Sequence, residues 1–217
     1  MLHFNDTPVL SEKETQKLAQ AKEKYITQAL ASSAVPLERV RYLYRKLQKD
    51  IIFPRMEFEL SGAIGVTILP KDERGKHYAS VYGALVNQMA GSYGIARALD
   101  ELVCDARIGV QGCLVEGCLI DQDTPTMHLW NVVSVQGRSY HLDLAMEIIS
   151  NPQTMRYSGE AGKPLSELDH DELPRIETLI PATKYCLVSD DVMRADHIWS
   201  DDGTPRCLSS YTPLRKL

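Results

Sequence analysis

Hydrophobic positions at helical intervals open the chain and predict two helices. Ser11 and Glu14 have the spacing of a capping box, and the apolar positions that follow recur every three or four residues. They are Leu18, Ala21, Tyr25, Ala29 and Leu30. The pattern predicts one long helix over residues 11–32. Pro36 suits the first turn of a second helix, which carries Leu37, Val40, Leu43, Tyr44 and Leu47 on one face.

The middle of the chain is punctuated by glycine and proline. Between residues 53 and 76 they predict a long loop with at most short strands around 56–60 and 64–69, and long loops in compact domains are often functional. Ser80 suits the cap of a short helix through Val86. The next helix is expected to begin at about Ser92, with an apolar stripe formed by Ile95, Ala98, Leu99, Leu102 and Val103.

Strand patterns dominate after residue 105. Residues 106–117 are typical of a strand, and residues 127–147 predict a hairpin that turns at Gln136 and Gly137. A short helix near 165–169 and a late strand over 184–189 are expected further on. Helices followed by antiparallel strands predict an α+β fold. We expect residues 1–35 to form an N-terminal helical extension and residues 36–217 to form a single core.

The predicted hairpin brings candidate chemistry to one face. With a two-residue turn, Val135 pairs with Arg138 and alternate positions share a side, so His128, Trp130, His141 and Asp143 project together. A carboxylate within reach of a histidine can fix the imidazole tautomer and stabilise its cation. The alternative is a half-buried sheet face on which both histidines are ordinary hydrogen-bonded residues.

Composition narrows the function classes. The 217 residues are 44% hydrophobic and 24% charged with net charge −5, which is ordinary for a globular protein and lacks the basic footprint of nucleic-acid binding. Neither a signal-peptide core nor a membrane-length apolar run is present, so a cytoplasmic location without membrane association is expected by default. The five cysteines are interpreted as reduced thiols. Cys113, Cys118 and His128 make only a weak zinc signal, and we expect neither a metal nor a cofactor.

Two segments resemble the transglutaminase-like superfamily, whose members share the papain-like cysteine-protease architecture. "HLWNVVSVQGRSYHLD" is similar to the family's His-Ala-Trp-Asn strand, turn and second strand ending in aspartate. "SVYGALVNQMAGSYGIARALDEL" is similar to the segment that ends in the nucleophile helix. The resemblance covers roughly residues 37–147 and implies catalytic positions at Ser92, His128 and Asp143. It also implies that residues 36–217 form a transglutaminase-like domain.

The departures from the family concern the nucleophile. Ser92 stands where the family has its catalytic cysteine, Ala90 replaces a glycine and Ile95 replaces an aromatic residue. A serine hydroxyl is too weak an acid to be held ionised by a helix N-terminus and an imidazolium, so His128 would have to act as a general base during attack. Cys104, at the far end of the same helix, cannot substitute for it.

Three interpretations of Ser92 stay open. It could be a plain helix N-cap in a non-catalytic domain, a working serine nucleophile, or a natural or engineered variant of an active cysteine enzyme. Three functions also stay open: a pseudoenzyme that binds a peptide or protein segment in its cleft, an amide hydrolase or acyl transferase with a triad of Ser92 (or a native cysteine), His128 and Asp143, and a structural module that docks through its N-terminal helix. Trp130, Tyr82 and Gln88 are the further candidates for lining the cleft or donating to an oxyanion.

Overall fold

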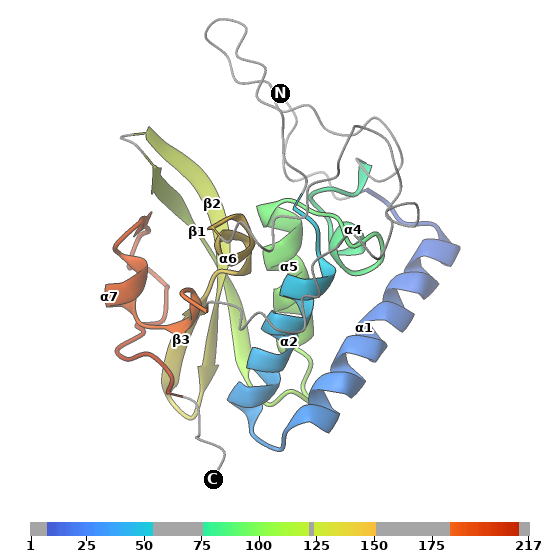
Figure 1. Cartoon of the computed structure of the whole chain (residues 1–217), viewed down its shortest axis with the longest axis horizontal. Coiled ribbons are helices and arrows are strands. Elements are labelled where there is room, and N and C mark those ends of the chain that lie inside the picture. Colours follow the sequence, from blue (N-terminus) through green and yellow to red (C-terminus); the bar gives the residue numbers. More distant parts are fainter. Residues whose placement is uncertain (1–7, 54–75, 122–123, 151–182, 213–217) are drawn as a thin grey trace, which may run out of the picture.

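A computed structural model gives the architecture, and it describes residues 8–53, 76–121, 124–150 and 183–212. Figure 1 shows helices gathered on one side of a curled antiparallel sheet, with the last described segment on the other side. The fold is therefore α+β, as predicted. None of the helices in these four ranges is both long enough and apolar enough to cross a lipid bilayer.

The first two helices begin as their sequences predict. Helix α1 (Glu12–Ser32) starts at the complete Ser11 and Glu14 capping box, and α2 (Pro36–Asp50) has proline in its first turn. Tyr25, Ile26 and Ala29 of α1 are buried in the same cluster as the apolar face of α2. The apolar stripe of α1 therefore packs against the rest of the protein.

Two further helices follow the segment 54–75, where the predicted short strands lie outside the described residues. Helix α4 (Val81–Leu85) is capped by Ser80, whose hydroxyl accepts from the backbone N–H of Gly83 at 3.2 Å. Helix α5 (Ser92–Val103) buries the predicted apolar stripe against the sheet. Its amphipathic pattern is the reason it lies flat on the strands.

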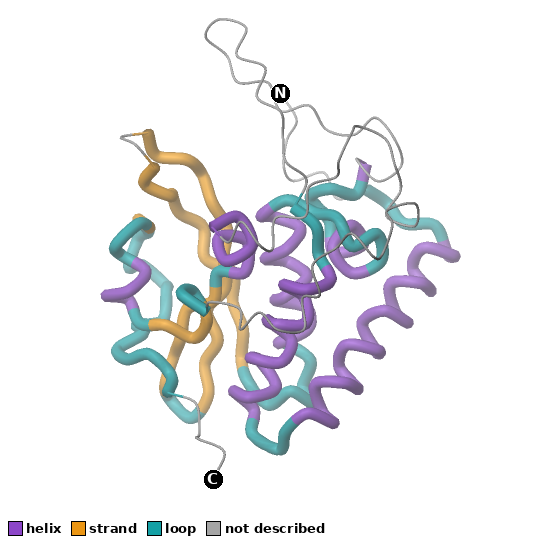
Figure 2. The backbone as a smooth tube through the Cα atoms, in the orientation of Figure 1, coloured by secondary structure: helices purple, strands orange, loops and turns teal. Residues whose placement is uncertain are grey.

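The sheet has the strand order β4-β3-β2-β1-β5, and every neighbouring pair is antiparallel. The bounds are β1 (Gln111–Asp121), β2 (Thr124–Val135), β3 (Arg138–Leu142), β4 (Cys186–Val188) and β5 (His197–Ile198). Two short helices, α6 (Leu144–Ser150) and α7 (Asp190–Met193), interrupt the later strands, as the tube in Figure 2 shows.

Two sequence-based boundaries are wrong. The strand expected from residue 106 begins at Gln111, because the chain turns through Gly109, whose φ of +85° suits glycine. The hairpin expected to run to residue 147 ends at Leu142, and residues 144–150 form α6. The helix expected at 165–169 lies outside the described residues, whereas the late strand is present as β4.

Apolar side chains form a separate cluster on each face of the sheet. Val133, Tyr140 and Leu142 belong to the large cluster shared with α1, α2 and α5. Trp130, Val132 and Val188 belong to a smaller cluster with Met193, Trp199 and Cys207, which covers the opposite face. The alternation of residues along β2 divides its side chains between the two clusters.

Candidate functional site

The hairpin of β2 and β3 has the predicted register. Val135 pairs with Arg138 and Asn131 pairs with Leu142, and the two-residue turn has positive φ at both Gln136 (51°) and Gly137 (74°). This turn places the odd and even positions on the expected faces. The predicted common face of His128, Trp130, His141 and Asp143 is confirmed by the pairing.

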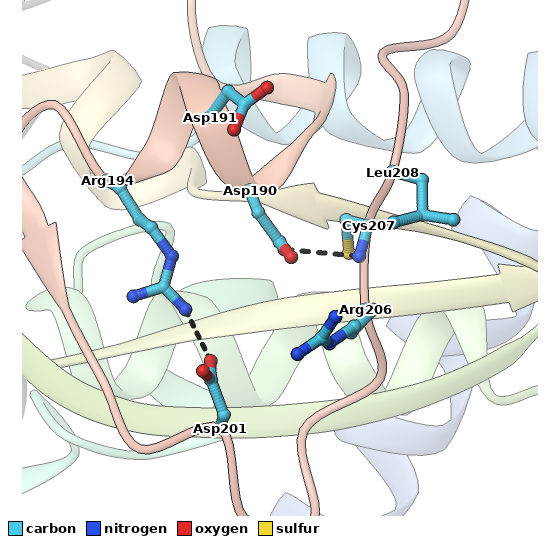
Figure 3. Close-up of a pocket in the computed structure, with 7 residues that line it drawn as sticks. All are labelled: Asp190, Asp191, Arg194, Asp201, Arg206, Cys207 and Leu208. Carbon is cyan, nitrogen blue, oxygen red and sulfur yellow. Dashed lines mark hydrogen bonds and ion pairs between the residues drawn. The ribbon is translucent and has the colours of Figure 1, made fainter.

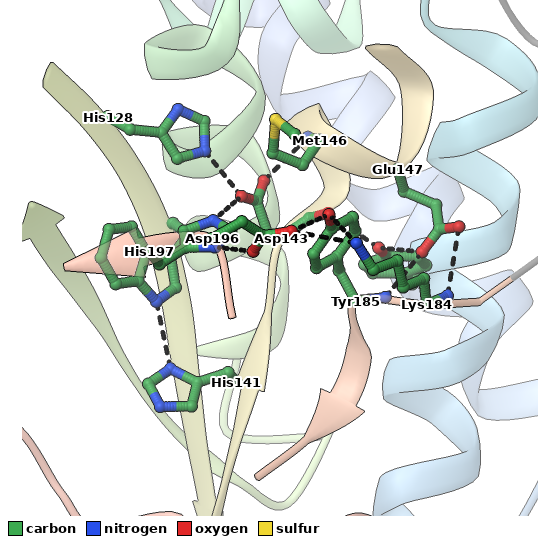
Figure 4. A network of polar contacts seen from close by, with 11 residues as sticks. His128, His141, Asp143, Met146, Glu147, Lys184, Tyr185, Asp196 and His197 are labelled. Atoms are coloured by element: carbon green, nitrogen blue, oxygen red, sulfur yellow. Dashed lines mark hydrogen bonds and ion pairs between the residues drawn. The ribbon is translucent and has the colours of Figure 1, made fainter. Parts of the chain in front are cut away.

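His128 and Asp143 form a buried hydrogen-bonded pair. Nε2 of His128 lies 2.6 Å from Oδ2 of Asp143, and the two residues are 2% and 1% exposed (Figure 4). A carboxylate at Nε2 fixes the tautomer in which that nitrogen carries the proton, and it leaves Nδ1 as the atom for exchanging a proton with a substrate or nucleophile. The pair has the geometry of an imidazole oriented for acid-base chemistry.

Backbone groups hold Asp143 in place. The residue caps α6, because its Oδ1 accepts from the backbone N–H of Met146 at 2.9 Å. Its own backbone N–H donates to the carbonyl of Tyr185, also at 2.9 Å, and its carbonyl accepts from the Tyr44 hydroxyl at 2.9 Å. Asp143 therefore lies between the end of β3 and the start of α6, and its backbone is also bonded to α2 and to the residue just before β4.

A third side chain at this site, His197, is not predicted from the sequence. Its Nε2 lies 2.9 Å from the same Oδ2 of Asp143, and its Nδ1 lies 2.6 Å from Oδ1 of Asp196. Burial alone would raise the pKa of Asp143, but the two histidines and the Met146 N–H lower it to about 2. Burial alone would lower the pKa of His197, yet the hydrogen bonds and charges of Asp143 and Asp196 raise it. The carboxylate and the His197 cation stabilise each other.

Ser92 does not cap its helix, so the N-cap interpretation is wrong. Gly91 is the N-cap residue, no side chain caps α5, and Ser92 is its first residue. A side chain at Gly91 would meet the ring of Tyr78 at 2.4 Å, which explains why glycine stands there. Ser92 is partly buried, and its hydroxyl forms no hydrogen bond within the described part of the chain. The described residues therefore show no structural role for the Ser92 hydroxyl.

Helix α5 is joined to β2 by a hydrogen bond near its middle. Asn131 on β2 donates to the carbonyl of Ala96 at 3.0 Å, one helical turn after Ser92. Tyr93, next to Ser92, lies close enough to Glu116 for that charge to add to burial in raising the Tyr93 pKa. Glu116 adjoins Gly117, the β1 partner of His128. The described residues show no hydrogen bond between Ser92 and His128, so their proximity stays a prediction.

Trp130 and His141 belong to a second network of hydrogen-bonded side chains on the same face of the sheet. The Trp130 indole N–H donates to Nδ1 of His141 at 3.0 Å, and Nε2 of His141 faces Oδ1 of Asp190 at 2.8 Å. Because Trp130 occupies the lone pair of Nδ1, the proton of neutral His141 sits on Nε2 and is donated to Asp190. Burial lowers the pKa of His141, which favours this neutral form. These hydrogen bonds link β2 and β3 to α7.

Two groups of side chains could be considered as metal ligands: His128, Asp143 and His197, and His141, Asp190 and Cys207. In the first, Nε2 of His128 lies 2.6 Å from Oδ2 of Asp143, whereas two ligands of one tetrahedral zinc would lie roughly 3.3 Å apart. In the second, His141 has no lone pair left for a metal while Trp130 donates to Nδ1. Both groups fit hydrogen bonding better than metal binding.

Cys113 and Cys118 project from opposite faces of β1, since an odd separation along a strand reverses the side. They do not converge on His128 as one set of ligands. Cys207 is buried, and burial raises its pKa. It lines a pocket of about 340 Å³ with Asp190, Asp191, Arg194, Asp201, Arg206 and Leu208 (Figure 3).

Tyr82 and Gln88, the other cleft candidates, face the N-terminal helix. The Tyr82 ring lies 4.7 Å from that of His77, and Glu14 of α1 adds to burial in raising the Tyr82 pKa. The side chain of Gln88 is hydrogen-bonded to Tyr25 of α1. Among the described residues, no hydrogen bond, ion pair or ring contact joins either of them to Ser92 or His128. Their role in a cleft stays a prediction.

No protein-family model matches the chain, and no curated protein matches it significantly in sequence. Among solved structures it is similar to one described as "Crystal structure of a TGase", with 11% identity and a TM-score of 0.48. The match covers 79% of this chain and 40% of the other, so the chain spans less than half the length of that protein.

Proposed function

We propose that the chain is a transglutaminase-like domain of papain-like architecture that keeps its histidine-aspartate pair but has lost its thiol nucleophile. In this proposal it binds a peptide or protein segment with little or no turnover. The observation that carries the proposal is the buried contact of 2.6 Å between His128 and Asp143, combined with a Ser92 hydroxyl that makes no hydrogen bond among the described residues.

The retained pair supports a site descended from acyl-transfer chemistry. Its aspartate is ionised, and two histidines and a helix N-terminus surround it, which is more organisation than an ordinary sheet face needs. The missing partner is a group that exchanges a proton with Nδ1 of His128. Serine is a poor replacement for cysteine there, because bond lengths differ and a misplacement of about 1 Å can cost roughly a hundredfold in rate.

A working serine triad is the second candidate function. It is favoured by the Ser92 hydroxyl, which makes no hydrogen bond among the described residues, since a serine that capped α5 would have had its lone pair occupied. In this alternative His128 takes the Ser92 proton during attack, and Asp143 stabilises the resulting imidazolium. The docking module is less well supported, because the apolar face of α1 is buried in the large cluster.

An acyl-transfer assay separates these functions. We would measure hydrolysis of a p-nitrophenyl ester and incorporation of a fluorescent amine into casein for the unmodified chain, Ser92→Cys and Ser92→Ala. Our proposal expects activity in Ser92→Cys alone, and a Ser92→Cys/His128→Asn double variant should remove it. Activity of the unmodified chain that disappears in Ser92→Ala would establish the serine enzyme instead. Inactivity of all variants would overturn the retained acyl-transfer scaffold.

A further inference from the structure

His197 reaches the site from a strand of only two residues. β5 pairs with β1, with Leu119 opposite His197 and Cys118 opposite Ile198. Gly117 allows this approach, because a side chain there would meet the carbonyl of Ile198 at 2.3 Å and the Trp130 ring at 2.7 Å. The imidazole is thereby inserted beside Asp143, about 54 residues away in sequence, and is 1% exposed.

Both ring nitrogens of His197 face carboxylate oxygens. An ionised carboxylate only accepts hydrogen bonds, so each nitrogen must carry a proton and the ring must be an imidazolium. Asp196 is held ionised by two other donors, the Tyr185 hydroxyl at 2.6 Å and the Lys184 ammonium at 2.9 Å, both on Oδ2. Its Oδ1 is left for Nδ1 of His197 at 2.6 Å. The requirement for two protons follows from geometry.

The surroundings of His197 supply charge of both signs. From β2 the rings of His128 and Trp130 lie 5.7 Å and 5.1 Å away, and from the chain before β4 the Tyr185 ring lies at 5.7 Å. His141 on β3 senses the His197 charge, which adds to burial in keeping the His141 pKa low. Among the groups described, the two aspartates are the carboxylates in direct contact with the ring. They balance its positive charge.

We propose that His197 is a positioning residue of the site: clamped as an imidazolium between Asp143 and Asp196, it fixes the Asp143 carboxylate with Oδ2 toward His128. In this arrangement Oδ2 of Asp143 accepts from both histidines, while Oδ1 is bound to α6. The carboxylate therefore has no freedom to rotate away from Nε2 of His128. Any catalytic consequence rests on the proposed function, but the charge state and the positioning do not.

Nitrogen NMR of the full-length protein tests the charge state without any substrate. We expect both ring nitrogens of His197 to stay protonated above the ordinary histidine pKa of about 6.5, because each faces a carboxylate oxygen. Asp196→Asn, which keeps the shape of the side chain, should lower the pH at which His197 loses its second proton. A His197 ring that loses its second proton at or below about pH 6.5, or one bound to a metal through Nε2, overturns the proposal.

The positioning role is tested through Asp143. In the unmodified protein the Asp143 carboxyl carbon should show no titration down to the pH at which the protein unfolds, because its pKa is lowered to about 2. In His197→Gln it should titrate within the folded range. His141→Gln is the matched control, because His141 is a buried histidine of the same face that contacts Asp190 instead. If His197→Gln is folded and leaves the Asp143 titration unchanged, the role assigned to His197 is wrong. If it does not fold, the spectrum of the unmodified protein still decides the charge state.

Discussion

Replacing Gly117 with alanine should displace β5 and disturb the site from a distance. The added Cβ would lie 2.3 Å from the carbonyl oxygen of Ile198, whereas an ordinary contact begins near 3.4 Å. The backbone of β5 therefore has to move by about 1 Å. If that displacement falls along the bond from His197 to Asp143, its length grows from 2.9 Å to roughly 4 Å, beyond hydrogen-bond distance.

The expected cost of Gly117→Ala is about 2–6 kcal/mol in the free energy of unfolding. Overpacking contributes about 1–3 kcal/mol, and a weakened hydrogen bond between charged groups adds a similar amount. Urea unfolding measures the total, and the ring-nitrogen signals of His197 report the site. Gly112→Ala is the control on the same strand. The three atoms nearest its added Cβ belong to the side chains of Cys104, Val103 and Asp100, at 2.8, 3.0 and 3.2 Å, whereas the nearest atom at Gly117 is a backbone carbonyl. Unchanged stability and unchanged His197 signals in Gly117→Ala would refute the reasoning.

Three further predictions concern stability. Trp130→Phe removes the N–H donated to His141 and should cost about 1–2 kcal/mol in urea unfolding; stability equal to the unmodified protein would contradict this hydrogen bond. Ser80→Ala should cost about 1 kcal/mol through loss of the α4 cap, and a change below about 0.3 kcal/mol in the same assay would show that the cap is unimportant. The stability of the fold should depend on pH through Asp143 and through His197. The lowered pKa of Asp143 gives stability that is present above about pH 4 and is lost as the pH falls toward about 2. The raised pKa of His197 gives stability that is full below about pH 6.5 and is lost as the pH rises through its folded value. Urea midpoints from acid to alkaline pH measure both, and a midpoint that rises steadily above about pH 6.5 would contradict the His197 contribution.

The features that the sequence could predict are those that depend on residues close together along the chain. The register of β2 and β3 depends on a two-residue turn whose residues tolerate positive φ, and this turn fixes which side chains share the face of His128. The capping box of α1 and the proline of α2 are likewise local signals. Each of these features needs only neighbouring residues.

The rest of the site depends on contacts between distant segments. β5 is two residues long, and its place is determined by pairing with β1 and by the missing side chain of Gly117. The role of His197 therefore had no local signal. Asp143 could have been recognised as the start of a helix, because it is a strong N-cap type followed by good helix formers, but the strand pattern before it suggested continuation. Gly91, not Ser92, is the N-cap of α5, and the Tyr78 ring leaves no room there for a side chain.

Our proposal requires residue 92 to stand beside His128, which would exchange a proton with it. The most direct measurement is the alkylation rate of the introduced thiol in Ser92→Cys with iodoacetamide, followed by peptide mapping across pH and compared with Ser92→Cys/His128→Asn. The account predicts that the thiol reacts well below the ordinary cysteine pKa of about 8.5, and that His128→Asn removes this low-pH reactivity. An ordinary thiol profile in Ser92→Cys, identical in the double variant, would contradict it.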